Sequence, residues 1–421
     1  MPDGGGYPRF SKDTRPRVLL LLASLHGGGA ERVATHLLSH CDPERLNVRM
    51  ALLRRSGPYL AHADQDRIDV SPFGQRWLEF EGHNSSFYRP HKLLVTAALA
   101  PLNVTGMVRA FQPDVVISFL KGMSLLSYFT RLSWGPTRPR WIAREGNNTH
   151  AVIDDELSGP MGRAFVKGLV GRCYRSADSV LASSHAMARG LESDLGVDPA
   201  RLSVIHNPID VSRIQALGAE PLEAPPERPF VVTAGRLEPQ KAHDLLLRAF
   251  ASSPACRDLD LVILGKGSQE AALWKLAHEL RIASRLKMPG FVANPWAWFA
   301  KSRLFVLPSR WEGFASVVAE ALACGAPTLV TDCDFGPSEV VEHGLSGWVA
   351  PTGDMEAFRA AMDRVLGDAE LAATLSRQGR RRARAFDVSD MVEAYSGLFI
   401  EQAMARRSAM TRVGELQLAE I

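Results

Sequence analysis

The chain has 421 residues, 46% of them hydrophobic and 23% charged, which is too long for one hydrophobic core and too apolar for a disordered protein. Its net charge of +3 is uneven: residues 1–201 hold 25 Lys and Arg against 19 Asp and Glu, and the remainder holds 24 against 27. This mild surplus argues against nucleic acid as a partner. It fits an anionic membrane or a phosphorylated substrate, or simply a basic solvated surface.

The cysteines and the apolar runs indicate the compartment. Five widely spaced cysteines without a C-x-x-C pair form no disulfide framework, which favours a reducing environment. The apolar run at residues 18–23 is too short for a signal peptide, and no stretch reaches the ~18 uncharged apolar residues that span a bilayer. We expect a cytoplasmic protein that at most binds the membrane peripherally.

Strand-like and helix-like segments alternate along the first half. Short apolar runs predict buried parallel strands at residues 18–23, 48–53, 114–119, 140–143, 179–182 and 202–206. Helical spacing of apolar residues predicts helices at 30–40 and 186–195. A strand, a glycine loop and a helix at residues 18–40 form the typical opening of a doubly wound domain.

The alternation stops and then restarts in the second half. Residues 217–229 hold four prolines and little periodicity, which predicts a linker. Strands follow at 230–234, 259–264, 304–307 and 328–331, and helices at 242–250, 270–280 and 317–324. The fold class is therefore α/β, with domains at 1–216 and 230–385. Residues 386–421 are expected to form terminal helices that partly cross back to the first domain.

The first candidate site is the glycine loop His26-Gly27-Gly28-Gly29-Ala30-Glu31. Glycines there let backbone amides approach a ligand, and the helix start favours an anion. Arg32 stands where a dinucleotide fingerprint needs its third glycine, which disfavours NAD. NADP remains open through Arg54, and a tight structural turn is the simpler interpretation of the loop alone.

Two further candidates follow strands of the second half. Arg236 and Lys241 flank a turn at a strand end, where paired cations can neutralise a diphosphate. Glu312 and Glu320 lie eight residues apart around a loop and a helix start. Between them, the amides of residues 313–316 can bind phosphate oxygens, and carboxylates accept hydrogen bonds from sugar hydroxyls.

These motifs carry a family resemblance. Residues 231–354 resemble the nucleotide-sugar half of the family 4 retaining glycosyltransferases, whose GT-B fold has two Rossmann-like domains facing across a cleft. The first half resembles them more loosely, through Gly27-Gly28 and the alternation. The motifs of the second half, in chain order, are Gly235-Arg236 with Lys241, Gly265-Lys266-Gly267, Pro289-Gly290-Phe291, Glu312 with Glu320, Gly336-Pro337-Ser338-Glu339, and Gly347 to Pro351.

The resemblance implies roles for single residues. Arg236 and Lys241 would contact the donor diphosphate, Glu320 the ribose and Glu312 the transferred sugar. The remaining residues implied at the donor are Gly27, Gly28, Gly265, Phe291, Phe314, Ala315 and Glu339. Family enzymes retain the anomeric configuration, and front-face attack with the leaving phosphate as proton acceptor needs no protein nucleophile.

One position departs from the family pattern. Many relatives carry a His after the strand that here reads Trp141 to Glu145. Arg144 or Glu145 stands there instead, in a pattern resembling bacterial members that build lipid-linked oligosaccharides. His150 is near enough in sequence to substitute, so these three are the candidate acceptor-side or catalytic groups of the first domain.

No metal cofactor is expected for the reaction. Asp332-Cys333-Asp334 is formally a metal-binding D-x-D pattern, but Arg236, Lys241 and a helix start already offer positive charge. Membrane contact is suggested by Arg163 and Lys167 beside Phe165, and by a basic segment before the apolar residues 93–102. Ordinary packing of amphipathic helices on their own sheet is the simpler interpretation of each segment taken alone.

The sequence therefore predicts a retaining glycosyltransferase. Its donor would be a nucleotide-sugar, by resemblance a UDP-sugar carrying a hexose or N-acetylhexosamine. Its acceptor would be a glycan or a polyprenyl-diphosphate-linked precursor of a surface polysaccharide or glycoconjugate. A nucleotide-sugar epimerase of the same fold, a non-catalytic carbohydrate- or lipid-binding protein and, more distantly, an NADP oxidoreductase remain alternatives.

Overall fold

The computed structural model describes residues 11, 14–26, 28–70, 90–135, 137–156, 159–222 and 224–419. Side chains are not described for His62, Val70, residues 90–98, His150, Asp155, Glu156 and residues 413–419. The chain divides into two compact units. The first contains residues 1–183, 188–205 and 389–421, and the second contains residues 184–187 and 206–388.

The first unit contains a parallel sheet of seven described strands in the order β3-β2-β1-β4-β5-β6-β7. Apolar side chains fill these strands, and in β1 and β4 nearly every residue is buried, as expected for a sheet covered on both faces. The strands are β1 (Arg17–Leu22), β2 (Asn47–Leu52), β3 (Ile68–Val70), β4 (Val115–Phe119), β5 (Arg140–Glu145), β6 (Ser179–Ala182) and β7 (Leu202–Val204).

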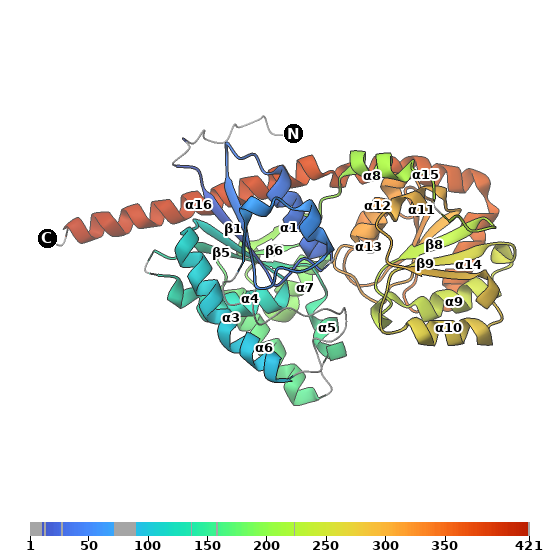
Figure 1. The fold of residues 1–421 in the computed structure, drawn as a ribbon, viewed down its shortest axis with the longest axis horizontal. Helices are drawn as coiled ribbons and strands as arrows, with labels where there is room; N and C mark the ends of the chain where they lie inside the picture. The colour runs from blue at the N-terminus through green and yellow to red at the C-terminus, as the bar shows by residue number, and fades with distance from the viewer. Residues whose placement is uncertain are drawn as a thin grey trace. The chain divides into compact units, whose positions relative to one another are not determined.

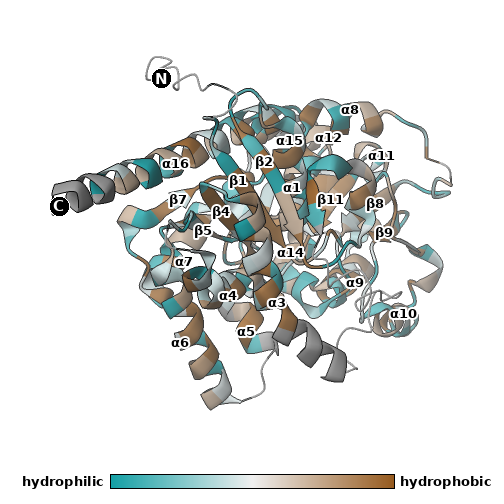
Figure 2. Cartoon of the chain, turned by 60° about the vertical axis from the view of Figure 1, so that its left-hand side comes forward, coloured by the Kyte–Doolittle hydropathy of each residue, from teal (hydrophilic) through white to brown (hydrophobic). Residues whose placement is uncertain are grey.

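Helices follow most strands of this unit (Figure 1). They are α1 (Gly29–His40), α3 (Pro90–Phe111), α4 (Leu120–Thr130), α5 (Thr149–Glu156), α6 (Pro160–Ser176) and α7 (His185–Leu195), of which residues 185–187 group with the second unit. Short 3₁₀ turns are η1 (Pro58–His62), η2 (Gln65–Arg67), η3 (Arg131–Trp134) and η4 (Pro199–Arg201). Figure 2 shows hydrophobic residues on α3, α6 and the central strands.

The second unit contains a parallel sheet of six strands in the order β10-β9-β8-β11-β12-β13, counted over the described residues. This is the strand order of a classical dinucleotide-binding fold, with a switch point between β8 and β11. The strands are β8 (Phe230–Ala234), β9 (Asp260–Leu264), β10 (Leu286–Gly290), β11 (Leu304–Leu307), β12 (Thr328–Thr331) and β13 (Trp348–Ala350).

Helices cover both faces of this sheet (Figure 1). They are α8 (Val211–Gly218), α9 (His243–Ser252), α10 (Glu270–Glu279), α11 (Trp296–Lys301), α12 (Ser316–Cys324), α13 (Pro337–Val340), α14 (Met355–Gly367) and α15 (Ala369–Ala383). The 3₁₀ turns are η5 (Pro239–Lys241), η6 (Pro254–Cys256), η7 (Ala283–Arg285) and η8 (Arg384–Phe386).

Alternate strand residues of this sheet enter two different cores, as the period of a strand requires. Val232 and Phe305 pack into one core with α12, while Val231 and Val306 pack into the other with α9 and α14. The second unit therefore has hydrophobic cores of its own, one on each face of its sheet.

The last helix, α16 (Val388–Ala419), returns to the first unit. Tyr395, Phe399 and Ala403 are fully buried along it. Near its end, Arg406 and Arg407 pair with Asp114, whose carboxylate is 7% exposed, at 2.7 and 2.8 Å. Apolar packing and this partly buried ion cluster hold the helix in place.

The chain changes unit between Ile205 and His206, ahead of the proposed linker at 217–229. Helix α8, which the sequence assigns to the first domain, packs against α11 and α12 of the second unit. The backbone of Ile209 also exchanges hydrogen bonds with Phe386 and Val388. These contacts explain why residues 206–216 group with the second unit, and the chain returns to the first unit between Val388 and Ser389.

No helix in the described part of the chain is both long enough and apolar enough to cross a bilayer. All five cysteines are buried, unpaired thiols. Burial raises the pKa of Cys173, Cys324 and Cys333 to about 12 and that of Cys41 and Cys256 to about 11, so the thiols stay protonated at neutral pH.

Candidate functional site

The candidate donor site lies at the carboxyl ends of β8 and β11, the two strands at the switch point of the second sheet. Open α/β sheets bind ligands at this place because the loops leaving the two strands diverge to opposite faces. Arg236 and Lys241 follow β8, and Glu312 follows β11. The fold therefore brings together groups that are about seventy residues apart in the chain.

Lys241 and Glu312 form a partly desolvated ion pair. The ammonium of Lys241 contacts Glu312 Oε1, and the two side chains are 13% and 7% exposed. Ser309 Oγ donates a second hydrogen bond, of 2.6 Å, to the same carboxylate oxygen. Because a buried charge needs partners, each member of this cluster holds the next one in a fixed orientation.

Gln240 links the two loops and was not singled out in the sequence. Its side chain accepts a 3.2 Å hydrogen bond from Arg236 and donates a 2.8 Å bond to the carbonyl of Trp311. Its own carbonyl accepts from the amide of Arg310. A glutamine within a turn carries no local signal, since these partners are set by tertiary structure alone.

Helix α12 begins beside this cluster with an exceptional backbone. Ala315, its N-cap, has φ of +59°, a left-handed conformation that costs a non-glycine residue about 1–2 kcal/mol. No side chain caps the helix start. Its first amides and its dipole therefore point toward the edge of the sheet as an anion site, beside Phe314 and Ala315.

Glu320 lies inside α12 and is 2% exposed. Its Oε2 accepts a 2.9 Å hydrogen bond from the indole of Trp296, on α11. Phe291, just after β10, is 62% exposed. An acid oriented by an indole suits a ribose, and an exposed aromatic residue suits a base; both assignments stay predictions.

Gly265 and Gly267 allow two loops to touch backbone to backbone. A Cβ at Gly265, where φ is +144°, would lie 1.8 Å from the carbonyl oxygen of Gly235. A Cβ at Gly267 would lie 2.4 Å from that of Leu237. Gly265 therefore allows its own loop to pack closely against the loop that carries Arg236. Its contact with the donor stays a prediction.

Glu339 bonds to protein groups. Its two oxygens accept hydrogen bonds from the amides of His185 and Ala186, at 2.8 and 2.6 Å, and His206 Nε2 lies 3.4 Å away. Partial burial acts to raise the pKa of this carboxyl, but the bonds from His206 and the two amides outweigh it and lower the pKa to about 2.

The candidates of the first unit are held by the protein itself. Arg144 is fully buried, donates a 2.8 Å hydrogen bond to the hydroxyl of Tyr395 and lies over the ring of Phe119. Glu145 accepts from the amides of Gly146 and Asn147 and from two hydroxyl groups. These contacts give both residues a structural role, and their predicted catalytic part stays a prediction.

The other candidates of this unit are less fully described. Gly28 is the N-cap of α1, where a Cβ would lie 2.4 Å from the Glu31 carboxylate, so a side chain would displace that group. Gly27 and the side chain of His150 lie outside the described residues. In the D-x-D pattern of the second unit, Asp332 accepts from the amide and hydroxyl of Thr352.

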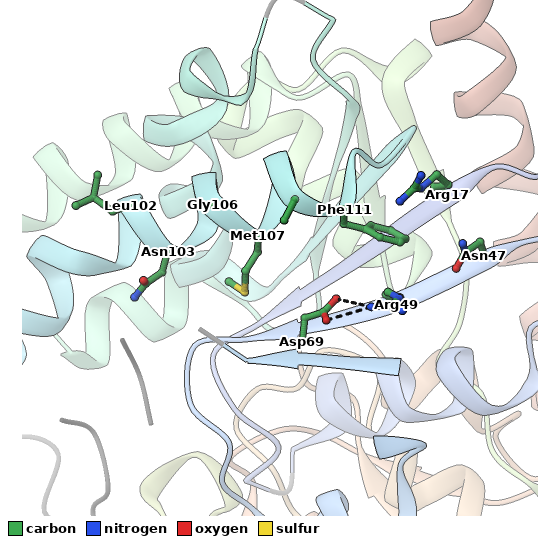
Figure 3. Close-up of a pocket in the computed structure, with 10 residues that line it drawn as sticks. Arg17, Asn47, Arg49, Asp69, Leu102, Asn103, Gly106, Met107 and Phe111 are labelled. Atoms are coloured by element: carbon green, nitrogen blue, oxygen red, sulfur yellow. Dashed lines mark hydrogen bonds and ion pairs between the residues drawn. The ribbon is translucent and has the colours of Figure 1, made fainter. Parts of the chain in front are cut away.

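A groove of about 570 Å³ lies beneath α3, at the edge of the first sheet where its strands begin (Figure 3). Arg49 pairs there with Asp69 at 3.2 Å, and Arg17 lies over the ring of Phe111. Asn103, from α3, also lines it. Among the described residues that line this groove, none is a predicted site residue.

Family models match the chain in both halves. The model described as Glycosyltransferase Family 4 matches residues 27–213, and the model described as Glycosyl transferases group 1 matches residues 219–382. Each match spans most of one of the two units. The two models meet near residues 214–218, close to the passage between the units.

Bacterial glycosyltransferases are among the similar proteins. The N-acetylgalactosamine-N,N'-diacetylbacillosaminyl-diphospho-undecaprenol 4-alpha-N-acetylgalactosaminyltransferase of Campylobacter jejuni is 29% identical over 261 residues, 59% of this chain and 70% of that protein. The lipopolysaccharide core biosynthesis glycosyltransferase LpsE of Rhizobium meliloti is 28% identical over 356 residues, 84% of this chain and 89% of that protein.

Solved structures share the fold. HepE of Anabaena, in complex with UDP and glucose, has a TM-score of 0.70 at 20% identity, over 91% of this chain and 99% of that chain. Sucrose-phosphate synthase of Thermosynechococcus elongatus has a TM-score of 0.72 at 17% identity, over 93% of this chain and 100% of that chain. With two parallel Rossmann-like sheets, a glycosyltransferase model matched in each half and these structural neighbours, the chain is a glycosyltransferase of GT-B fold and belongs to family 4.

Proposed function

We propose that this enzyme transfers a hexose or N-acetylhexosamine from a UDP-sugar to a glycan acceptor carried on polyprenyl diphosphate, with retention of configuration. The observation that carries the donor part is the cluster at one sheet edge: Arg236, the Lys241–Glu312 pair and the start of α12. The name of the Campylobacter relative, which specifies a diphospho-undecaprenol-linked glycan, supports the carrier. LpsE, named for lipopolysaccharide core biosynthesis, supports a glycan acceptor.

The proposed chemistry depends on charge and position. As the bond between sugar and diphosphate breaks, negative charge grows on the leaving phosphate. Arg236, Lys241 and the amides of α12 would stabilise it in a site that is already oriented. The acceptor hydroxyl attacks the same face and gives its proton to the leaving phosphate oxygen. Glu312 holds the sugar hydroxyls, and we assign no metal to this step.

The donor proposal is tested by thermal-shift titration with UDP-, GDP- and ADP-sugars. A ligand at one hundred times its Kd stabilises the folded state by about 2.7 kcal/mol. We expect a shift with a UDP-sugar that Arg236→Ala and Glu320→Ala each largely remove. Arg248→Ala and Glu270→Ala, at exposed helix positions of the same unit, serve as matched controls. Equal shifts in all four variants would show that the donor binds elsewhere.

The reaction itself separates the proposal from its alternatives. Incubation with a UDP-sugar and a polyprenyl-diphosphate-linked glycan should give an α-linked product from an α-linked donor, which NMR coupling at the anomeric proton reports. Conversion of the UDP-sugar without an acceptor would instead identify an epimerase. Binding without turnover of either kind would identify a carbohydrate-binding protein.

Contact with an anionic membrane is the last part of the proposal, and it rests on exposed apolar side chains of the first unit. Met161 and Phe165, one turn apart on α6, are 85% and 73% exposed, and Leu132 is 81% exposed. Arg163 and Lys167 lie on the same helix. Apolar residues with nearby cations bind the interface of anionic bilayers.

Co-sedimentation with vesicles tests this contact. Wild-type protein should bind vesicles containing phosphatidylglycerol more strongly than neutral ones, and the double variant Met161→Ser with Phe165→Ser should lose most of the binding. Leu345→Ser, at an exposed apolar residue of the second unit, should bind as wild type does. Unchanged binding of the double variant would remove α6 from the proposed surface.

A further inference from the structure

Three potential metal ligands meet beside the donor site. One ligand atom from each of His185, His206 and Glu339 lies within 4.8 Å of the other two, and all three residues belong to the second unit. The planes of the two imidazole rings stand at 77° with their centroids 5.8 Å apart. Nothing in the proposed transfer uses this cluster.

The spacing between His206 and Glu339 is that of a long hydrogen bond, and it also fits two ligands of a shared ion. Their closest atoms, Nε2 and Oε2, are 3.4 Å apart. A charge-assisted hydrogen bond between such groups is about 2.7–2.9 Å long. Two donor atoms that each lie about 2.0–2.1 Å from a tetrahedral ion are separated by roughly 3.3–3.4 Å, the edge of the tetrahedron.

The two half-buried members of the cluster, His206 and Glu339, are oriented by the surrounding protein. The amides of His185 and Ala186 donate hydrogen bonds to the two carboxylate oxygens of Glu339. The ring of His206 stacks on Phe314 at 5.2 Å and meets the edge of Phe386 at 5.4 Å. Such outer contacts are what fix ligands around protein-bound metals.

We propose that His185, His206 and Glu339 bind one divalent transition-metal ion of the Zn²⁺ class, with a fourth position open to water or an anion. Two imidazoles and one carboxylate suit Zn²⁺, Co²⁺ or Ni²⁺ rather than Mg²⁺, which requires oxygen ligands.

The ion would stiffen the loop that starts helix α12. Phe314, which stacks on His206, directly precedes Ala315, the left-handed N-cap of that helix. A bound ion would hold the ring of His206 and therefore the aromatic stack on which this loop rests. The inference depends only on residues of the second unit, whatever the donor or acceptor is.

Cobalt absorption spectroscopy tests the site on the full-length protein after treatment with EDTA and desalting. We expect one equivalent of Co²⁺ to produce the visible bands of a four-coordinate ion and Zn²⁺ to bleach them. His185→Ala keeps the backbone amide that holds Glu339 and removes only the ring. It should weaken Co²⁺ binding at least about tenfold, the effect of losing even an outer contact in a metal site.

Two further variants keep the result unambiguous. His206→Phe preserves the stack on Phe314 but removes the ligand atom, so it should abolish the bands without loss of thermal stability in the metal-free protein. The obvious competitor is the pair His36 and His40, one turn apart on α1 with ring centroids 5.5 Å apart. The variant His40→Ala should bind Co²⁺ as wild type does.

The opposite results overturn the proposal. They are bands that survive in His185→Ala and His206→Phe, bands that vanish in His40→Ala, or no binding of stoichiometric Co²⁺. Because absorption needs no substrate, a failed donor assay leaves this result unaffected, and a failed metal titration leaves the donor proposal standing.

Discussion

At the residue scale, charged groups at the donor edge are held by partners that sequence spacing does not reveal. Lys241 and Glu312 pair across two loops, and Ser309 completes the cluster. Next to them, His243 opens helix α9 at 3% exposure, and its Nε2 has no hydrogen-bond partner among the described residues. A neutral histidine buried beside a lysine makes the fold sensitive to acid.

Burial, followed by the charge of Lys241, lowers the pKa of His243 from 6.5 to about 3. Between these values the unfolded chain binds a proton that the folded chain excludes, so stability falls as the pH drops below 6.5. We predict that His243→Leu gains roughly 2 kcal/mol relative to wild type between pH 7.5 and pH 5. Urea unfolding at several pH values measures this difference.

His278→Leu is the matched control, because His278 is an exposed residue of α10. Its stability relative to wild type should not change with pH. If the curves for His243→Leu and wild type stay parallel from pH 7.5 to pH 5, then His243 binds its proton equally in the folded and unfolded chains, and burial does not lower its pKa.

At the scale of elements, the site depends on loops that approach each other more closely than side chains permit. The loops after β8 and β9 touch at Gly235 and Gly265, and Gly336 leaves no room for a Cβ beside Phe314. Two helices that start at this edge, α9 and α12, begin after left-handed alanines, Ala242 and Ala315. Strained backbone of this kind is common where a ligand must be met by main-chain groups.

We predict that Gly265→Ala destabilises the protein by about 3 kcal/mol or more, since it adds both a positive-φ cost and a clash with a carbonyl. Gly135→Ala is the control: its φ is +114°, but a Cβ there meets nothing within 4 Å. It should lose only the conformational part of the stability, about 1–3 kcal/mol, without the added clash. Urea unfolding measures both, and equal losses would show that the close approach of the loops costs nothing.

At the scale of the whole molecule, each unit has its own sheet and its own buried residues. Phe358 packs in a core of the second unit, whereas Tyr395, on α16, belongs to the first unit. Helix α16 therefore links the end of the chain to the unit in which the chain begins. Because the two units bury different residues, a substitution in one unit should destabilise that unit and leave the other unit unchanged.

We predict that Tyr395→Ala and Phe358→Ala each cost about 3–5 kcal/mol, as large-to-small changes at fully buried aromatic residues do. Hydrogen exchange followed by mass spectrometry should show faster exchange in β4 for Tyr395→Ala and in β9 for Phe358→Ala. If each variant accelerates exchange equally in both strands, the two units unfold as one cooperative body.

Local pattern was enough to predict the elements that are strongly periodic. The strands expected at 179–182, 230–234, 304–307 and 328–331 have the observed bounds, because a buried parallel strand is a short, uninterrupted apolar run. The short edge strands β3, β10 and β13 and the proline-containing helix α3 carry no such signal and were not predicted. Edge strands have an exposed side, so their side chains need not be apolar.

The sequence by itself determined the alternating α/β architecture, the family and the candidate donor residues, because periodicity and motif spacing are local properties of the chain. Only the tertiary structure decided the strand order, the pairing of Lys241 with Glu312, the bridge made by Gln240 and the meeting of Glu339 with His185 and His206. These contacts join residues about seventy to one hundred and fifty positions apart. They exist because the sheet edge gathers loops from several strands, and no local pattern encodes that assembly.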